Sequence, residues 1–248
     1  MSAAAPLAEV FSSFQGEGPF VGVRQVFVRL RGCTLTCRYC DTPEARSEAG
    51  LCRIERAPGS NAWEQVTNPL TADAVAAIAT DLARGVPHHS ISLTGGEPLR
   101  QPEFVAELAA LLKQAGHRTY LDTACCTPEA MATVAPLVDI VAADFKLPVT
   151  MAEPVPFDDF ARSWQAIRGE RFAKIVLTEA VMPEDFAAHC ARLAALDAAM
   201  QVVLQPATPT GPVRPPSGPA LFALAEVAAA YLPNVRVIPQ CHPLLGVR

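Results

Sequence analysis

VFVRLRGCTLTCRYC, residues 26–40, is an apolar strand pattern that runs directly into three cysteines. Structural zinc sites and simple electron-transfer [4Fe–4S] clusters each use four protein ligands. Three thiols on one loop, Cys33, Cys37 and Cys40, therefore favour a [4Fe–4S] cluster whose fourth iron binds a small chelating molecule. A zinc site completed by Cys52 or a histidine, or three buried thiols, are the alternatives.

The composition around this stretch is that of a globular protein with a sizeable core. Half of the 248 residues are apolar, and the net charge is −5, which argues against binding nucleic acid through bulk charge. The first residues lack the pattern of a signal peptide, and no uncharged apolar run reaches the roughly 18 residues of a membrane span. We expect one domain, residues 1–248, in the cytoplasm, with no membrane or nucleic-acid partner.

Strand and helix patterns alternate along the chain, which is typical of a parallel α/β sheet. Apolar runs predict strands at 26–30, 91–93, 119–122, 140–144, 174–178, 201–204 and 235–238. Periodic apolar positions, capping residues and glycine stops predict helices at about 71–84, 102–115, 128–135, 158–168, 184–197 and 220–231.

Two segments interrupt this alternation. Residues 43–70 form a polar insertion too long for an ordinary βα loop, and residues 206–219 form a proline-rich loop. The insertion could cover the site, or contact a second subunit or a reductant. Its arginines, Arg53 and Arg56, are expected to be solvated.

Polar and glycine-rich residues follow the predicted strands, where parallel sheets gather their functional groups. Besides the cysteines, these features are Thr94–Pro98, Asp122-Thr123, Asp144–Lys146 and Gln205-Pro206. The sequence therefore predicts that they share one mouth of a barrel or part-barrel.

The C-x-x-x-C-x-x-C loop, together with Gly95-Gly96-Glu97-Pro98 after the next strand, resembles the radical S-adenosylmethionine (radical SAM) superfamily. The resemblance implies that Cys33, Cys37 and Cys40 hold a [4Fe–4S] cluster and that S-adenosylmethionine chelates its open iron. Glycines suit this place because the backbone can approach the methionine amine without a Cβ in the way.

Three further segments resemble one family within it, 7-carboxy-7-deazaguanine synthase. They are Phe14-Gln15-Gly16-Glu17-Gly18-Pro19, Cys40-Asp41-Thr42 and Gln240-Cys241-His242-Pro243-Leu244-Leu245-Gly246. The resemblance implies a (β/α)6 partial barrel of the radical SAM type, with the insertion after the cluster loop, that forms a homodimer. It also implies conversion of 6-carboxy-5,6,7,8-tetrahydropterin to 7-carboxy-7-deazaguanine and ammonia, with Mg²⁺ and an external flavodoxin- or ferredoxin-like electron donor.

Carried over residue by residue, the resemblance gives three groups of site residues. Thr42 would bind Mg²⁺, although it could equally be a capping hydroxyl. The substrate would be held by Phe14, Gln15, Gly16, Arg29 and Thr94. The S-adenosylmethionine pocket would be lined by Tyr39, Cys40, Asp41, Gly96, Asp144, Phe145, Lys146, Gln205, Pro206, Ala207 and Thr208.

Some of these residues also have plain structural readings. Arg29 suits a bidentate carboxylate clamp but could be a sheet-edge cation, and Phe14 could be a core residue. Asp144 and Lys146 could form an ordinary ion pair. His242 is expected to be structural or to contact substrate, and no chemistry is assigned to it.

The alternative function is a radical SAM enzyme with another substrate, such as an activase of a glycyl-radical enzyme, because the same cysteine spacing occurs there. A non-enzymatic cluster or metal protein is a third hypothesis, and it would need a fourth protein ligand. One departure from the family stands out: Ala124-Cys125-Cys126 follows Asp122-Thr123, in place of a serine or asparagine and a glycine. These cysteines could be packing residues or a redox liability.

Overall fold

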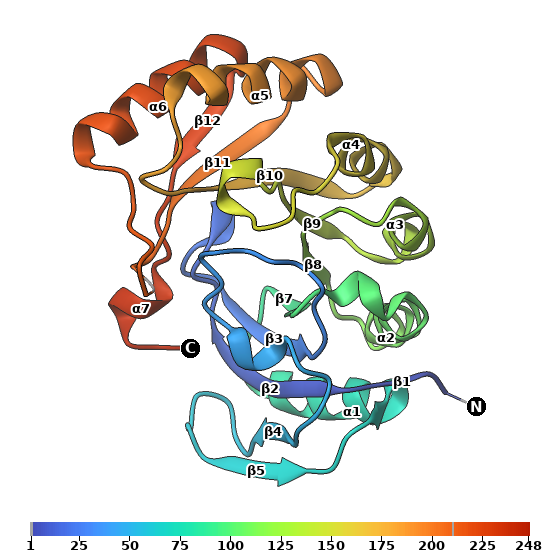
Figure 1. Cartoon of the computed structure of the whole chain (residues 1–248). Coiled ribbons are helices and arrows are strands. Elements are labelled where there is room, and N and C mark those ends of the chain that lie inside the picture. Colours follow the sequence, from blue (N-terminus) through green and yellow to red (C-terminus); the bar gives the residue numbers. More distant parts are fainter. Residues whose placement is uncertain (1, 210) are drawn as a thin grey trace.

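The computed structural model describes residues 2–209 and 211–248 and is built on one curved ten-stranded sheet (Figure 1). Its strand order is β12-β11-β10-β9-β8-β7-β3-β2-β4-β5. The first seven strands in this order run parallel. They are β3 (Arg24–Leu30), β7 (Ser90–Gly95), β8 (Thr119–Thr123), β9 (Ile140–Asp144), β10 (Glu170–Leu177), β11 (Gln201–Pro206) and β12 (Asn234–Val237). The seven predicted strands, and with them the partial-barrel prediction, are confirmed.

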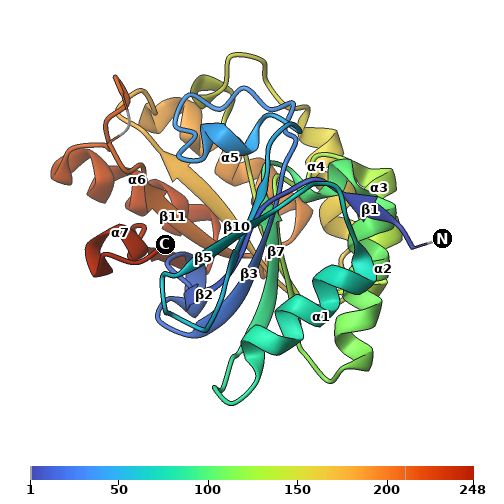
Figure 2. The same ribbon diagram turned by 90° about the horizontal axis from the view of Figure 1, so that it is seen from below.

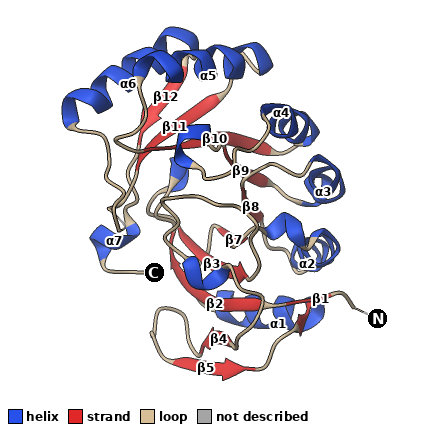
Figure 3. Cartoon of the chain, in the orientation of Figure 1, coloured by secondary structure: helices blue, strands red, loops and turns tan. Residues whose placement is uncertain are grey.

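The helices cover the outer face of this sheet (Figures 2 and 3). They are α1 (Ala72–Ala83), α2 (Pro102–Gln114), α3 (Pro128–Val134), α4 (Phe157–Ala166), α5 (Pro183–Leu196), α6 (Gly218–Tyr231) and the short α7 (His242–Leu245). Short 3₁₀ turns lie at Gly18–Phe20, Pro43–Ala45, Pro98–Arg100, Ala135–Leu137 and Pro148–Thr150. Thr71 caps α1 by accepting a hydrogen bond from the Ala74 amide. The six longer helices were predicted, and α7 was not.

The sheet packs differently on its two faces because side chains alternate along a strand. On the outer face, side chains such as Leu93, Leu121 and Ile175 form the main core with the helices. On the inner face, Tyr120, Phe172 and three other residues form a second apolar cluster. Each such buried aromatic ring contributes about 2–3 kcal/mol. The polar site lies further along the strands, toward their carboxyl ends.

The edge beyond β3 is the part of the fold that the sequence left open. β2 (Leu7–Phe14) pairs antiparallel with β3 and parallel with β4. β4 (Cys52–Glu55) and β5 (Trp63–Val66) form a hairpin, and β1 (Ala4–Ala5) pairs with β6 (Leu70–Thr71). The insertion therefore extends the sheet. β2 was not predicted: its residues are buried on both faces, so its sequence lacks a period-two pattern.

The proline-rich segment leaves β11 and leads to α6, whose first turn is capped by Ser217. Residue 210, within that segment, lies outside the described residues. Among the residues that are described, none of the helices has the length and apolar character that crossing a membrane requires.

Candidate active site

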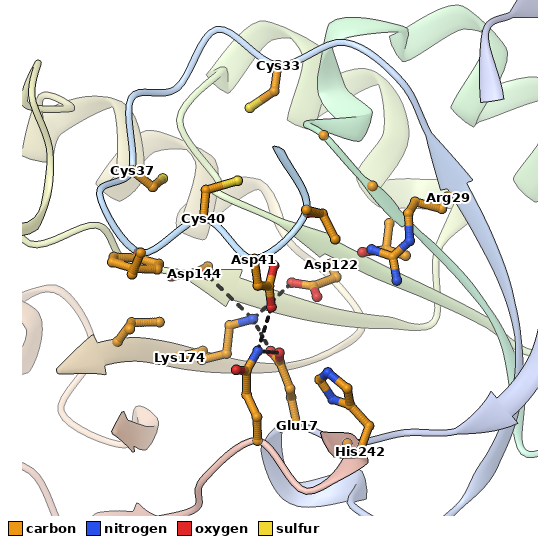
Figure 4. Close-up of a pocket in the computed structure, with 18 of the residues that line it drawn as sticks. Glu17, Arg29, Cys33, Cys37, Cys40, Asp41, Asp122, Asp144, Lys174 and His242 are labelled. Carbon is orange, nitrogen blue, oxygen red and sulfur yellow. Dashed lines mark hydrogen bonds and ion pairs between the residues drawn. The ribbon is translucent and has the colours of Figure 1, made fainter. Parts of the chain in front are cut away.

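A cavity of about 550 Å³ opens at the carboxyl ends of the parallel strands, within the usual range for small-molecule sites. Parallel pairing brings these ends together: Leu30 lies beside Gly95, and Leu177 lies beside Pro206. The loop after β3 and the segments 14–17 and 240–243 also line it. Figure 4 shows the three thiols on one side of this space and Arg29 on the other.

Cys33, Cys37 and Cys40 all line this cavity from the loop that follows β3. The loop is held largely by its backbone: Cys37 pairs with Met151 in an isolated β-bridge, and Arg46 donates to the Cys37 carbonyl at 2.9 Å. Burial raises the pKa of the Cys33 and Cys37 thiols. Binding iron would reverse this shift, because a metal binds the thiolate.

These thiols suit a cluster better than a single metal ion. No three His, Cys, Asp or Glu side chains in the described part of the chain are arranged to hold one ion. Thiols that bind a [4Fe–4S] cluster bind different irons, so they need not converge on one point. Cys52 is buried on β4, outside the cavity lining, so the alternative of a zinc site completed by Cys52 is wrong.

The Gly-Gly-Glu-Pro motif fastens the cluster loop to the sheet. A Cβ on Gly96 would lie 2.3 Å from the Gly32 carbonyl oxygen and 2.9 Å from that of Ala45. Buried Glu97 accepts hydrogen bonds from the Thr123 hydroxyl at 2.6 Å and from two backbone amides, and burial raises its pKa. The close approach that requires glycine here is therefore made by this chain's own backbone, in addition to any ligand.

Two buried polar oxygens of the cavity lining have no hydrogen-bond partner among the described residues. They are Asp144 Oδ1 and Gln205 Oε1. Asp144 Oδ2 pairs with Lys146 Nζ at 2.8 Å, and Lys146 lies 5.2 Å from the centre of the Tyr39 ring. Buried acceptors without a donor are what a ligand rich in hydroxyl and ammonium groups would satisfy.

Most of the other predicted cofactor-binding residues line the same cavity, namely Tyr39, Asp41, Gly96, Lys146, Ala207 and Thr208. Phe145 and Pro206 do not. The Phe145 ring packs between Phe160, at 4.9 Å, and Phe157, at 5.9 Å, in the helix layer, because it alternates with Asp144. The prediction that these two residues line the pocket is wrong for their side chains.

A second buried lysine, Lys174 on β10, sits at the floor of the cavity (Figure 4). Its Nζ lies 2.5 Å from Glu17, 3.4 Å from Asp144 and 3.5 Å from Asp122. With Lys146 these residues form what we call the lysine cluster. Burial raises the pKa of Asp122 to about 6 despite Lys174, whereas Lys174 outweighs burial and lowers the pKa of Glu17.

A second ionic group, the arginine cluster, surrounds Glu9 on β2. Glu9 is 3% exposed and pairs with Arg29, Arg53 and Arg248. Glu9, Arg29 and Arg248 line the cavity. The expectation that Arg53 is a solvated insertion residue is wrong, because its guanidinium bonds Glu9 at 2.7 Å.

The two terminal motifs meet beside these clusters. A Cβ on Gly16 would lie 2.3 Å from His242 Nδ1, and the Cys241 amide donates to the Gly16 carbonyl at 2.8 Å. Gln240 bridges Glu17, at 2.7 Å, and Asp41, at 2.8 Å. The other predicted substrate and metal residues, Phe14, Gln15, Thr42 and Thr94, line the cavity with them.

Comparison with known proteins agrees with this geometry. Residues 27–150 match the Radical SAM superfamily. Two proteins named 7-carboxy-7-deazaguanine synthase are similar over nearly the whole chain. The one from Geobacter sulfurreducens is 39% identical over 98% of this chain and 97% of its own, and the one from Methanothermobacter thermautotrophicus is 35% identical over 98% of each. The chain belongs to the 7-carboxy-7-deazaguanine synthase family.

Solved structures support the same fold. QueE from Escherichia coli superposes with a TM-score of 0.62 at 20% identity, covering 96% of this chain and 94% of that one. A radical SAM methyltransferase from Sphaerobacter thermophilus gives 0.60 at 16% identity, covering 95% and 77%. Membership of the radical SAM superfamily implies a [4Fe–4S] cluster and S-adenosylmethionine as cofactors. Against this background the activase alternative is less supported than the family's own reaction.

Sequence reasoning missed Lys174, Asp122 and Glu9 as site residues. Lys174 carried a signal: it is a charged residue at an inward position between Phe172 and Val176 in an otherwise apolar strand. Glu9 carried none, since β2 itself was not predicted. The departure at 124–126 has a partial account: Cys125 is fully buried in the main core, so packing is its role, while Cys126 is half-buried.

Proposed function

We propose that this chain is a radical SAM lyase that converts 6-carboxy-5,6,7,8-tetrahydropterin to 7-carboxy-7-deazaguanine and ammonia. The observation that carries the proposal is that a single cavity joins the three-thiol loop to the arginine cluster and to both terminal motifs. Full-length similarity to the synthases named above supports it. The cavity volume also suits two small molecules held side by side more than a protein segment.

The residues fit the cofactors that the superfamily implies. Cys33, Cys37 and Cys40 would hold the cluster, whose reducing electron, passed to S-adenosylmethionine, supplies a 5′-deoxyadenosyl radical for hydrogen abstraction. Asp144 Oδ1 and Gln205 Oε1 are buried acceptors that lack partners within the described chain. They can accept hydrogen bonds from the amine and hydroxyl groups of S-adenosylmethionine.

The substrate side of the cavity offers a carboxylate clamp and a proton carrier. Arg29 presents a planar guanidinium that suits a pterin carboxylate. Asp122, with its pKa raised to about 6, can hold or release a proton near neutral pH. Release of ammonia needs proton transfer to a nitrogen, and Asp122 in the cavity lining is suited to that step.

Mg²⁺, the homodimer, the cytoplasmic location and the external flavodoxin- or ferredoxin-like donor belong to the same proposal. A hard cation prefers oxygen ligands and keeps several waters, so the Thr42 hydroxyl can be its protein ligand if substrate oxygens supply others. The position of Thr42 in the cavity lining supports this assignment.

One assay tests the reaction. Anaerobically reconstituted protein, with its cluster confirmed by absorbance, is mixed with reductant, Mg²⁺, S-adenosylmethionine and 6-carboxytetrahydropterin. We expect 7-carboxy-7-deazaguanine by mass spectrometry, without stoichiometric loss of S-adenosylmethionine. Slow release of 5′-deoxyadenosine with the pterin unchanged would leave the cofactor chemistry standing and refute the substrate.

Two variants test the site assignments within that assay. Cys37→Ala should abolish the cluster absorbance and all cleavage of S-adenosylmethionine, and retained cleavage would refute the cluster ligands. Thr42→Ala should lose most of the stimulation by Mg²⁺ while the cluster absorbance is unchanged. If Mg²⁺ stimulates both proteins equally, Thr42 is not a ligand.

A further inference from the structure

The arginine cluster is fixed by the pairing of three adjacent strands. In the sheet register, Glu9 on β2 lies directly beside Arg29 on β3 and directly beside Arg53 on β4. Directly opposed residues point to the same face, so the three side chains form one row facing the cavity. A shift of the hairpin by one residue would turn Arg53 to the other face.

Glu9 holds Arg29 in a particular way. Arg29 Nε donates to Glu9 Oε1 at 3.0 Å, and its two terminal nitrogens make no hydrogen bond to any residue that the structure describes. The other carboxylate oxygen, Oε2, accepts from Arg53 at 2.7 Å and lies 3.1 Å from Arg248. One carboxylate therefore fixes the Arg29 side chain by its Nε and leaves the bidentate end of the guanidinium available.

Aromatic rings fix the two outer arginines. Arg53 and Arg248 lie 5.1 and 5.2 Å from the centre of the Trp63 ring, on the β5 strand of the hairpin. Trp63 in turn contacts Phe11 at 6.1 Å, and Phe11 lies 5.9 Å from Arg29. The hairpin thus supplies a cation and the ring that positions it, both from the insertion that follows the cluster loop.

The charge of this group is unbalanced. Every ion pair that these three arginines make within the described residues goes to the single carboxylate of Glu9. Three guanidiniums around one carboxylate repel one another, and a second anion between them would relieve that repulsion. Arg29 and Arg248 line the cavity, so an anion placed there would belong to a ligand in the active site.

We infer that the β4–β5 hairpin is a specificity element, in which Arg53 acts through Glu9 to set Arg29 for the carboxylate of the substrate. This inference rests on the proposed function. Arg53 is a positioning residue, since it reaches Glu9 and is not part of the cavity lining. The insertion therefore contributes to recognition of a carboxylated substrate, in addition to closing the edge of the sheet.

The test compares Arg53→Gln with Arg56→Gln. Arg56 lies next to the end of β4, is exposed, and its side chain makes no ion pair among the described residues, so it is a matched control. Each variant is assayed for KM and kcat with 6-carboxytetrahydropterin. The inhibition constant of tetrahydropterin, which lacks the carboxylate, is measured alongside.

For Arg53→Gln we expect KM to rise about tenfold, as for loss of one charged hydrogen bond, with kcat nearly unchanged. The inhibition constant of tetrahydropterin should stay as in the wild type. Arg53→Lys, which keeps the charge, should recover part of the KM, and Arg56→Gln should match the wild type. A merely structural effect would instead weaken both pterins together.

Two results would overturn the inference. One is an unchanged KM in Arg53→Gln, and the other is an equal loss of affinity for the carboxylated and the uncarboxylated pterin. If Arg53→Gln does not fold, the same comparison is made with Arg53→Lys, for which a wild-type KM ratio between the two pterins overturns it. A wild-type protein that forms no deazaguanine would instead refute the proposed function, so the two failures are distinguishable.

Discussion

The lysine cluster and the arginine cluster line the same cavity but differ in burial and in the sign of their charge. In the lysine cluster, Lys174 and Lys146 have side chains only 6% and 9% exposed and face three carboxylates. In the arginine cluster, three guanidiniums that are 18–39% exposed face one carboxylate. The first group has an excess of negative charge and the second an excess of positive charge.

This difference separates what the fold requires from what the ligand requires. A buried ammonium loses its hydration, so it is stable only when carboxylates surround it, and removing either partner leaves a charge without compensation. Half-buried guanidiniums keep part of their hydration, so removing one affects the protein less and the ligand more. The lysine cluster should therefore control folding, and the arginine cluster should control substrate selection.

The largest expected effect is at the centre of the lysine cluster. Lys174→Met should lower the free energy of unfolding by about 3–5 kcal/mol, because Glu17 and its neighbours lose their shared cation. It should also abolish product formation. Guanidinium unfolding of anaerobically reconstituted protein, followed by circular dichroism, measures the change.

Lys113→Met is the matched control for that substitution. Lys113 pairs with Asp139 at 2.9 Å on α2, but its side chain is 39% exposed. Its loss should cost less than about 1 kcal/mol. Equal losses for the two lysines would show that burial does not distinguish the lysine cluster from a surface pair.

The two clusters also differ in how far the sequence could foretell them. The strand ends that carry Asp122, Asp144 and Gln205 were predicted, because apolar runs followed by polar residues mark the carboxyl edge of a parallel sheet. The cysteine loop was predicted from spacing alone. These features are local, so each can be read within about ten residues.

The arginine cluster is non-local, and for that reason it was missed. Glu9 and Arg53 are 44 positions apart and meet only because β2 accepts the hairpin in one register. β2 has no alternation to reveal it, and an arginine in a polar insertion has the composition of a solvated loop. Lys174 lies between these cases: its strand was predicted, but the carboxylates around it come from three other segments of the chain.

A middle-sized effect concerns the pH dependence of the lysine cluster. A carboxyl whose folded pKa is raised contributes stability that is fully present below its unfolded pKa, near 4, and is lost as the pH rises through the folded value. For Asp122 that value is about 6, because of burial. The wild type should therefore gain about 1 kcal/mol relative to Asp122→Asn when the pH falls from 7 to 5.

Unfolding curves of both proteins at pH 5, 6 and 7, without added S-adenosylmethionine, measure this difference. Other titrating groups cancel when the two proteins are compared at each pH. A constant difference across the range would mean that Asp122 is ionised throughout and that the lysine cluster carries one more negative charge at pH 5 than its geometry suggests.

The smallest expected effect on folding is in the arginine cluster. Arg53→Gln should lower the free energy of unfolding by less than about 1 kcal/mol, because Glu9 keeps Arg29 at 3.0 Å and Arg248 at 3.1 Å. Denaturant unfolding beside Lys174→Met measures both in one experiment. A loss near that of Lys174→Met would make Arg53 part of the folding core and would erase the contrast between the clusters. A small loss in folding together with a tenfold rise in KM would place its effect on the substrate, since a residue needed only for the sheet edge would change stability first.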